Sequence, residues 1–502
     1  MTTFLPGPAP APPRSSPRLP VKLPVELPVA ADRHATLPLT GQIAAQLREA
    51  LTGGRLAAGE RLPSSRALAA ALGVSRTVVT AAYTQLFAEG WLEGRHGSGT
   101  YVAPGAGPPV GGPLAGGPDP AQAPAAASRP DTPWAVPPPP GGGAAISLWP
   151  GIPWQAGIDP AAWRRAWRHA GTEPVPAQPD HRGRAALREA LTGYLRRSRG
   201  VCATADQILA TRGVSGGLRL VSSALLRPGD RVGVEEPGYQ AARAVFASCG
   251  AQLVPCRVDG DGLVVEELPD GLRLVYTTPA HQYPLGGTLP VPRRQALAAW
   301  ARATGALIIE DDYDGEFRYD VAPLPTLFGL DPEVVIYLGT TSKTLTPAVG
   351  AGWLVARPDL VPVLTAAAAE LGERVSGPVQ LAVTEFLASG ELERHVRRMR
   401  HEYARRRAVM VTALGGRLTG DTAGMHMLLE LPPGTAAATA EAAWQRGVHV
   451  STLDRYFAGP PTREGLVLGY GAADLAAVSR GCQVIAAIVA GLPGARGAVP
   501  PR

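Results

Sequence analysis

The stretch between residues 40 and 103 has the apolar spacing of short amphipathic helices. Its predicted elements are helices over residues 40–54, 62–73 and 74–90 and a short hairpin over 91–103. In the first helix Ile43, Leu47 and Leu51 lie one helical turn apart, so they share a face. In the second, Ser64 precedes the apolar positions and Gly73 follows them, and these residue types are favoured at helix ends. Two short helices joined through a glycine turn predict a helix-turn-helix.

The helices over 62–73 and 74–90 divide into inward and outward faces. The expected inward positions are Leu68, Ala71 and Leu72 in the former and Val79, Ala82 and Leu86 in the latter. The outward face of the latter begins with Arg76 and Thr77, and such side chains reach base edges in the major groove. The Gly-rich hairpin tip offers backbone amides to phosphates. We therefore predict a reader of double-stranded DNA, with a small stable domain that has no ligand as the alternative.

From residue 146 onward the pattern changes to strands that alternate with helices. Strand runs occur at 230–239, 272–279, 306–314 and 334–343, and helical runs include 185–196 and 293–305. The alternation predicts an α/β fold with a mainly parallel sheet. Ligands of such sheets bind at the carboxyl ends of the strands. The unusual residues gather at those ends, in 235–239, 279–286, 310–314 and 339–343.

Composition divides the chain into four parts. Residues 1–36 are rich in Pro, and residues 104–145 consist largely of Pro, Gly and Ala. Such segments cannot bury enough apolar surface to fold. The expected parts are a disordered Pro-rich tail over 1–36, a DNA-binding domain over 37–103, a linker over 104–145 and a large domain over 146–494. We see neither a secretory signal nor an apolar run of about 18 residues. We therefore expect a cytoplasmic protein without a membrane partner.

Charge and cysteine content narrow the choice of partner. The net charge of +6 is compatible with a nucleic-acid partner. The four cysteines show no CxxC or Cys/His spacing, so we predict no metal site. The basic run over 394–407 is interpreted as a solvated helix paired with acids, with a second DNA-facing surface as the alternative.

Lysine usage points to covalent chemistry. Lys and Arg total 48, yet the only lysines are Lys22, in the Pro-rich tail, and Lys343. Arginine cannot lose its proton and attack a carbonyl group, whereas a desolvated lysine can. We interpret Lys343 as an amine that forms a Schiff base with an aldehyde cofactor; the alternative is the chance survival of a surface lysine.

The other groups that pyridoxal phosphate requires occur in the same domain. The cofactor needs a carboxylate at its ring nitrogen, a donor at its ring oxygen, a stacking ring and a phosphate cradle. Acids and Tyr313 follow the strand at 306–314, Tyr239 lies on a turn, and 211–218 is a Gly/Ser loop that enters a helix. Together with Lys343, this set predicts a pyridoxal 5'-phosphate site.

Long stretches of the chain resemble known families. The segment LPSSRALAAALGVSRTVVTAAYTQLFAEGWLEGRHGSGTYV resembles the head of the GntR family of bacterial regulators. The segments PGDRVGVEEPGY, TPAHQYPLGGTL, IIEDDYDGEFRY and VIYLGTTSKTL resemble class I (fold type I) aminotransferases. Head and body together resemble the MocR subfamily of GntR regulators. The resemblance implies a winged helix-turn-helix fused to a fold type I aminotransferase-like domain, in a head-to-tail homodimer.

The resemblance also implies roles for individual residues. The implied DNA contacts are Arg66, Ser75, Arg76, Thr77 and Thr80 and, at the wing, His96 and Gly97. The implied cofactor contacts are Lys343 through the Schiff base, Asp311 at the ring nitrogen, Tyr313 at the ring oxygen, Tyr239 by stacking, and Val214, Ser215, Thr340 and Ser342 at the phosphate. His281 and Gln282 are implied to line the pocket.

Two positions depart from the family pattern. An Arg that holds the cofactor phosphate usually follows the lysine by seven positions, and here that position is Gly350. The bidentate contact is therefore missing or supplied from elsewhere. The Arg that holds a substrate carboxylate in aminotransferases is replaced by Val467 or a neighbour, while Arg463 lies in the preceding loop.

These departures favour a regulator over an enzyme. Our main hypothesis is a transcriptional regulator whose effector is pyridoxal phosphate or its adduct with an amine. The alternatives are an active aminotransferase with an accessory DNA-binding head, and a body that has decayed into a dimerisation scaffold. Nothing in the sequence selects an operator or a target gene.

Overall fold

The computed structural model describes most of the two predicted domains. The described residues are 27, 29–33, 35, 37–95, 99–104, 145–174, 178, 180–319 and 325–492. The chain forms two compact units, Met1–Pro108 and Pro109–Arg502. Most of the predicted tail over 1–36 and of the predicted linker over 104–145 lies outside the described residues.

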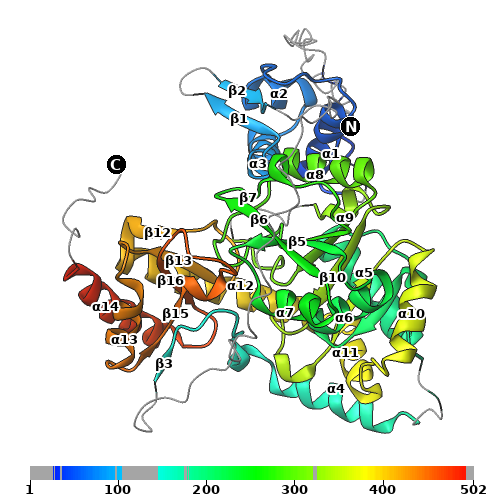
Figure 1. Cartoon of the computed structure of the whole chain (residues 1–502). Helices are drawn as coiled ribbons and strands as arrows, with labels where there is room; N and C mark the ends of the chain where they lie inside the picture. The colour runs from blue at the N-terminus through cyan, green and yellow to red at the C-terminus, as the bar shows by residue number, and fades with distance from the viewer. Residues whose placement is uncertain are drawn as a thin grey trace, which may run out of the picture. The chain divides into compact units, whose positions relative to one another are not determined.

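The first unit, called the head, contains three helices and a hairpin (Figure 1). Its elements are α1 (Leu39–Thr52), α2 (Ser65–Leu72), α3 (Arg76–Ala88), β1 (Leu92–Arg95) and β2 (Gly99–Val102). Helices α1 and α2 both pack on α3, and β1 pairs antiparallel with β2. The predicted helices and hairpin are thus confirmed.

Local chemistry sets the helix ends in the head. The Ser64 hydroxyl accepts the N–H of Ala67 at 3.2 Å, and Gly73 ends α2 in the left-handed conformation with φ of 64°. The predicted inward face of α2 needs one correction, because Ala71 is exposed and Ala69 is buried. Leu68 is buried as predicted and Leu72 is half-buried, so Ala71 is the one predicted inward position that the structure contradicts.

The second unit, called the body, is built on an eight-stranded sheet (Figure 1). The strand order is β4 (Ile208–Thr211), β11 (Gly352–Val355), β10 (Val335–Thr340), β9 (Leu307–Asp312), β8 (Leu274–Thr277), β5 (Arg231–Glu236), β6 (Gln252–Asp259) and β7 (Gly262–Leu263). The strands from β10 to β6 in this order are parallel to their neighbours. Strand β11 is antiparallel to both of its neighbours, as is β7 to β6. The predicted α/β fold with a mainly parallel sheet is confirmed.

Helices cover both faces of this sheet, because successive strand residues join different cores. In β9, Ile308 packs in one core and Ile309 in another. The Ile308 core includes residues of α4 (Pro160–Thr172), α5 (Ala185–Arg199), α8 (Val291–Thr304), α9 (Leu327–Leu330) and α11 (Gly377–Ala388). The Ile309 core includes residues of α6 (Gly213–Leu225), α7 (Gln240–Ser248) and α10 (Leu360–Glu370). Parallel strands with both faces buried are apolar almost throughout, which is why the sequence shows them as unbroken apolar runs.

A smaller antiparallel sheet completes the body. Its order is β12 (Leu418–Thr419), β13 (His426–Glu430), β16 (Gly465–Gly469) and β15 (Ser451–Thr452). It shares a core with residues of α12 (Glu391–Leu414), α13 (Ala436–Trp444) and α14 (Leu475–Ala490). The short strands β3 (Ile146–Ser147) and β14 (Val448–His449) pair in parallel beside it.

The basic run over 394–407 lies in α12. Arg394 and Arg398 pair with Glu391, and Arg405 and Arg406 pair with Glu402. For these arginines the interpretation as a helix paired with acids is confirmed.

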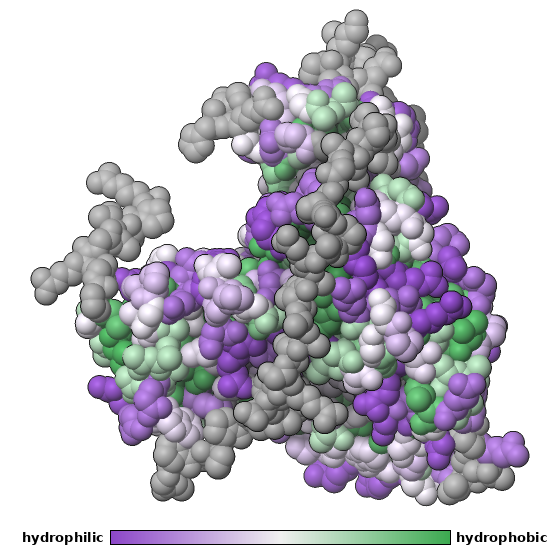
Figure 2. Space-filling model, viewed as in Figure 1, coloured by the Kyte–Doolittle hydropathy of each residue, from purple (hydrophilic) through white to green (hydrophobic). Residues whose placement is uncertain are grey.

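The length and hydropathy of the helices in the part of the chain that the structure describes bear on a membrane span. No helix there is both long and apolar enough to cross a bilayer. On the face shown in Figure 2, hydrophilic and hydrophobic residues are interspersed in small groups.

Candidate functional site

The head presents a polar surface around the start of α3. The predicted contact residues that the structure describes are all exposed: Arg66, Ser75, Arg76, Thr77 and Thr80. The Ser75 hydroxyl accepts the N–H of Val78 at 3.4 Å, and the Arg76 Nε donates to the Ser65 hydroxyl at 3.3 Å. The predicted wing residues His96 and Gly97 lie outside the described residues.

This surface has the chemistry of a DNA-reading helix. Thr77 and Thr80 lie on one side of α3, while Val79 on the other side is fully buried. A helix of this kind places its first turn against base edges and uses its positive N-terminal end for phosphates. The three-helix core therefore fixes the position of an exposed polar first turn.

The body contains a cavity of about 310 Å³ at the carboxyl ends of β5, β8, β9 and β10. Eight residues predicted from the cofactor pattern line it: Lys343, Asp311, Tyr313, Tyr239, Val214, Ser215, Thr340 and Ser342. These residues are scattered over more than a hundred positions of the chain, and the parallel sheet brings them to one edge. The cavity thus lies at the carboxyl ends of the strands, where parallel sheets of this kind bind ligands.

Lys343 lies just after β10 with its amine turned into this cavity. Its Nζ donates to the carbonyl oxygen of Gly151 at 2.7 Å. Burial lowers the pKa of Lys343 because it penalises the ammonium form, and the carboxylates of Asp314 and Asp311 oppose this effect. A lysine whose pKa is lowered by desolvation is a better nucleophile towards an aldehyde.

Asp311 lies on β9 with one carboxylate oxygen satisfied and the other without a partner. Its Oδ2 accepts the Tyr276 hydroxyl at 2.5 Å. Its Oδ1 is buried and has no hydrogen-bond partner among the described residues. Burial raises the pKa of Asp311 to about 7. An orphaned carboxylate oxygen on a residue of the cavity wall fits a cationic N–H donor, such as a protonated pyridine ring.

Two tyrosines supply further contacts to this cavity. The Tyr313 hydroxyl donates to the carbonyl oxygen of His281 at 2.9 Å. Tyr239 is at the N-terminal end of α7 and meets the Tyr283 ring edge-on, with the ring centroids 5.9 Å apart. Burial raises the pKa of Tyr239 to about 12, so it stays a neutral ring at physiological pH.

The start of α6 and the end of β10 form a cradle for an anion. Gly213 begins α6 with φ of +69°, and a Cβ there would lie 3.5 Å from the Thr340 hydroxyl and 3.8 Å from that of Ser342. The Thr340 hydroxyl donates to the Ser342 hydroxyl at 2.9 Å. Backbone amides at a helix start, two hydroxyl groups and a glycine that allows close approach are suited to a phosphate group.

The prediction that His281 and Gln282 line the pocket needs correction. Neither residue is part of the cavity wall, which instead contains Tyr283 from the same loop. The Gln282 amide donates to Glu235 at 3.1 Å and to the carbonyl oxygens of Pro237 at 3.0 Å and Tyr283 at 2.8 Å. Gln282 therefore ties the loop to the end of β5, behind the cavity.

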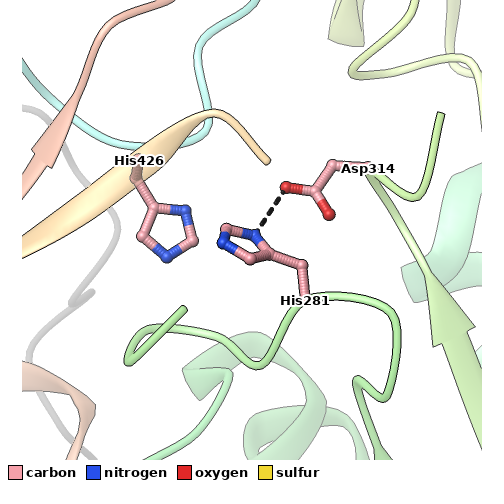
Figure 3. Close-up of side chains that lie close together, drawn as sticks. All are labelled: His281, Asp314 and His426. Atoms are coloured by element: carbon pink, nitrogen blue, oxygen red, sulfur yellow. Dashed lines mark hydrogen bonds and ion pairs between the residues drawn. The ribbon is translucent and has the colours of Figure 1, made fainter. Parts of the chain in front are cut away.

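His281 belongs to a buried cluster with Asp314 and His426 (Figure 3). The His281 Nδ1 hydrogen-bonds to Asp314 at 3.0 Å, and the His426 Nε2 lies 3.2 Å from the carbonyl oxygen of Pro284. No spacing signal indicates this group in the sequence, because its members come from three separate segments. Burial lowers the pKa of His426 well below its usual value, so this imidazole is neutral.

The cluster has the residue types of a metal site, and its ligand atoms lie within 4.8 Å of one another. Hydrogen bonds already engage His281 and His426. The cluster instead fixes His281, whose carbonyl oxygen accepts the Tyr313 hydroxyl.

The structure shows the surroundings of the two positions that depart from the family pattern, Gly350 and Val467. Gly350 ends a short 3-10 helix, Pro347–Val349, with φ of +59°, and no described atom lies within 4 Å of a Cβ built there. Val467 on β16 is fully buried in the apolar core. Arg463 pairs with Glu430 and is not part of the cavity wall.

Several cavity residues were not predicted from the sequence. They include Trp149, Gly151, Arg212, Tyr276, Tyr283, Arg455 and Tyr456. Arg212 lies inside the Gly/Ser loop at 211–218 that was identified from the sequence. Its positive charge in a loop suited to phosphate was the signal that could have predicted it. Trp149 and Arg455 gave none, because only the fold brings the two segments together, with the Arg455 guanidinium 5.4 Å from the Trp149 ring centroid.

Comparison with protein families identifies both units. Residues 39–102 match the model of bacterial regulatory proteins of the gntR family. Residues 154–461 match the model of class I and II aminotransferases.

Relatives with the same combination are regulators. The chain is 37% identical over 451 residues to the HTH-type pyridoxine biosynthesis transcriptional regulator PdxR of Corynebacterium glutamicum, covering 89% of this chain and 94% of that protein. It is 36% identical over 458 residues to the probable rhizopine catabolism regulatory protein MocR of Rhizobium meliloti, covering 88% and 92%.

Solved structures similar to this chain are aminotransferases. A kynurenine aminotransferase of Pyrococcus horikoshii, in complex with PMP, matches with a TM-score of 0.64 and 26% identity over 69% of this chain and 91% of the other. The α-aminoadipate aminotransferase LysN of Thermus thermophilus, complexed with N-(5'-phosphopyridoxyl)-L-leucine, matches with a TM-score of 0.63 and 25% identity over 69% and 92%.

Proposed function

The chain belongs to the MocR-type branch of the GntR family of bacterial regulators, and from this premise we propose that it is a DNA-binding transcriptional regulator that responds to pyridoxal 5'-phosphate. The aminotransferase-like body binds the cofactor. In this proposal the bound cofactor, or its adduct with an amine, is the effector, and the body also joins two copies into a head-to-tail homodimer.

One observation supports the cofactor part of the proposal above all others. Lys343, the single lysine of the body, shares a cavity with the orphaned Oδ1 of Asp311 and the cradle at Gly213. An amine, a carboxylate and an anion cradle are what this cofactor requires. When bound, pyridoxal phosphate supplies an aldehyde that combines with amines and a ring that accepts electron density.

The residues of the cavity then have separate tasks. Lys343 would hold the aldehyde carbon, and Asp311 would keep the ring nitrogen protonated. Tyr313 would turn its hydroxyl proton from the His281 carbonyl oxygen to the ring oxygen, and Tyr239 would pack on the ring. Val214, Ser215, Thr340 and Ser342 would hold the phosphate.

In this proposal the head recognises the DNA sequence. Arg76, Thr77 and Thr80 contact base edges from the first turn of α3, while Arg66 and Ser75 contact the backbone. Symmetric dimers read two half-sites, so we expect an operator with two similar half-sites. The head has only a small excess of positive charge. The specificity of DNA binding therefore depends on contacts of individual side chains with the DNA rather than on overall charge.

Titration with cofactor and DNA tests the proposal. Purified protein is mixed with pyridoxal phosphate, and the absorbance band of the lysine-linked cofactor is followed for the wild type and for Lys343→Ala. The affinity for DNA from the promoters of neighbouring genes is measured with and without cofactor. We expect a band and a cofactor-dependent change in affinity for the wild type, and neither for Lys343→Ala. A wild-type protein that stays colourless, with constant DNA affinity, refutes the proposal.

Active transamination is the second candidate, because the similar solved structures are aminotransferases and the body keeps Lys343, Asp311 and Tyr313. The apolar burial of Val467 speaks against it, since no arginine projects from that strand position. The assay is steady formation of keto acid from an amino acid and a second keto acid. Sustained turnover favours the enzyme, and its absence favours the regulator.

A further inference from the structure

The phosphate end of the cavity lacks the cation that the family pattern places there. A phosphate monoester carries close to two negative charges at neutral pH, and amides and hydroxyl groups alone leave that charge only partly compensated. At position 350 the side chain is a hydrogen atom. The question is therefore which other cation of this chain faces the cradle.

The cavity wall contains two arginines, Arg212 and Arg455. Arg455 lies over the ring of Trp149, on the segment whose Gly151 carbonyl accepts the Lys343 amine. That segment borders the aldehyde end of the site. Arg212 directly precedes Gly213 at the start of α6, which is the cradle itself. Of the two arginines, Arg212 is therefore the one at the phosphate end of the cavity.

Glu373 holds the Arg212 guanidinium in a fixed orientation. The Nε and Nη2 of Arg212 each donate to a different oxygen of Glu373 at 2.7 Å. This fork uses one edge of the guanidinium and leaves Nη1 for a ligand. The Glu373 side chain is buried, with 3% exposed, whereas 57% of the Arg212 side chain is exposed, so a buried carboxylate anchors one edge of a guanidinium that solvent reaches.

The α6 sequence makes room for this pair. A Cβ at Gly216 would lie 2.9 Å from the Glu373 Oε1 and 3.3 Å from the Arg212 Cβ. Glycine at this position therefore lets the Glu373 carboxylate approach the first turn of the helix. Glycine at position 216 is therefore explained by the packing of Glu373 against Arg212, and not by phosphate binding alone.

From this geometry we infer that Arg212 supplies the guanidinium contact to the cofactor phosphate that Gly350 does not provide. Glu373 acts as its positioning residue, because it aligns the guanidinium and touches no ligand. The inference rests on the cofactor binding described under the proposed function. It adds a residue to the site rather than a new ligand.

The test compares pyridoxal phosphate with pyridoxal, which lacks the phosphate. Apparent dissociation constants are measured from the absorbance of the lysine-linked ligand for the wild type, Arg212→Gln and Arg219→Gln. Arg219 is a matched control, because it is an exposed arginine on the same helix that is absent from the cavity wall. We expect Arg212→Gln to weaken pyridoxal phosphate binding about tenfold and to change pyridoxal binding by less than about twofold, with Arg219→Gln like the wild type.

The outcomes separate this inference from the proposed function. If the wild type gives no band with either ligand, the cofactor assignment fails. If the wild type binds and Arg212→Gln binds pyridoxal phosphate equally well, or loses both ligands to the same extent, the Arg212 inference alone fails.

A second variant covers the case in which Arg212→Gln does not fold. Arg212→Lys keeps the positive charge but cannot form the fork to Glu373. Weaker binding of pyridoxal phosphate with unchanged pyridoxal binding supports the inference. Binding of both ligands at the wild-type level overturns it.

Discussion

At the scale of single residues, the end of β9 concentrates buried carboxyl groups. Burial raises the pKa values of Glu310, Asp311 and Glu316 to about 7. Asp312 is compensated by a buried ion pair with Arg199, with 2.5 Å between the closest atoms. Asp311 has no such cation in the described chain, apart from the attraction of Lys343. The cofactor-free protein therefore holds an acid whose charged form is unfavourable until a ligand compensates it.

This acid makes the stability of the cofactor-free protein depend on pH. The pKa of Asp311 is about 7 in the folded state against a usual value of 3.8. The folded protein keeps a proton that the unfolded chain releases between these values, so the free energy of unfolding falls by about 1.4 kcal/mol per pH unit in this window and levels off above pH 7. Asp311→Asn removes this loss. Between pH 5 and pH 8 we expect the variant to gain about 2–3 kcal/mol relative to the wild type.

Urea unfolding of both cofactor-free proteins at pH 5 and pH 8 measures the difference. The same variant is expected to bind pyridoxal phosphate more weakly, since an amide does not hold the ring nitrogen protonated. A stability difference that is the same at both pH values contradicts the assigned titration.

Position 350 allows the opposite experiment to the removal of Arg212, because an arginine can be introduced where the family pattern has one. An arginine placed there has open space around its Cβ, but the backbone φ of +59° costs an L-residue about 1–2 kcal/mol. We expect Gly350→Arg to lower the free energy of unfolding by about that amount and to tighten pyridoxal phosphate binding about tenfold, with pyridoxal unchanged. Unchanged phosphate preference would show that position 350 does not reach the cradle in this chain.

At the scale of elements, the sequence predicted what local pattern controls. Strands β9 and β10 were predicted because both of their faces are buried, which produces apolar runs at 307–309 and 335–338. Helix α2 was placed by its caps, Ser64 and Gly73, and only the inward position of Ala71 was wrong. The phosphate loop was found because glycine at a helix start has a recognisable pattern.

Elements whose place depends on distant pairing could not be predicted. The wall formed by Trp149 and Gly151 follows the two-residue strand β3, which pairs with β14 some 300 positions away. Arg455 and Tyr456 belong to a short 3-10 helix, Leu453–Tyr456, that comes directly after β15. Strands of two residues have no periodicity to detect, so no local pattern indicates that these residues meet Lys343.

Within the head, one buried ion pair joins α1 to the end of α3. The Arg48 guanidinium donates to both oxygens of Glu89, at 3.0 and 2.7 Å, and Glu89 is fully buried. Removing one partner of a buried pair leaves the other unpaired and costs about 3–5 kcal/mol; since Arg48 is partly exposed, we expect Glu89→Ala to cost the head about 2–3 kcal/mol.

Amide hydrogen exchange of the full chain reports this loss in the head alone. The matched control is Glu49→Ala, because Glu49 pairs with Arg55 at 3.2 Å on the surface with 76% of its side chain exposed, where such pairs contribute at most about 1 kcal/mol. The cofactor absorbance band should be unchanged in both variants. Equal effects of the two substitutions would contradict the role of the buried pair.

At the scale of the whole molecule, the question is how a ligand in the body affects the head. The two compact units fold around separate cores, so cofactor binding does not need to alter the structure of the DNA-reading surface. Under the proposed function, a response requires two arrangements of the proposed homodimer that differ in their affinity for DNA. The cofactor shifts the balance only if it also binds the two arrangements with different affinity.

This requirement gives a strict quantitative prediction. If pyridoxal phosphate changes the affinity for the operator by some factor, the operator must change the affinity for pyridoxal phosphate by the same factor. We expect a factor between about 5 and 150, the usual range for coupled sites. DNA affinity is measured at zero and saturating cofactor by fluorescence anisotropy, and cofactor affinity is measured by absorbance with and without saturating operator.

The reciprocal pair of measurements separates coupling from artefact. A cofactor that altered DNA binding by reacting with amines on the surface would change one affinity without the matching change in the other. In the wild type such a side reaction has little scope, since Lys22 and Lys343 are the only lysines. Lys343→Ala removes the attachment point inside the cavity and keeps Lys22, so both factors should fall to one. If one factor persists in this variant, the signal does not pass through the cavity, and the link between cofactor occupancy and DNA binding is lost.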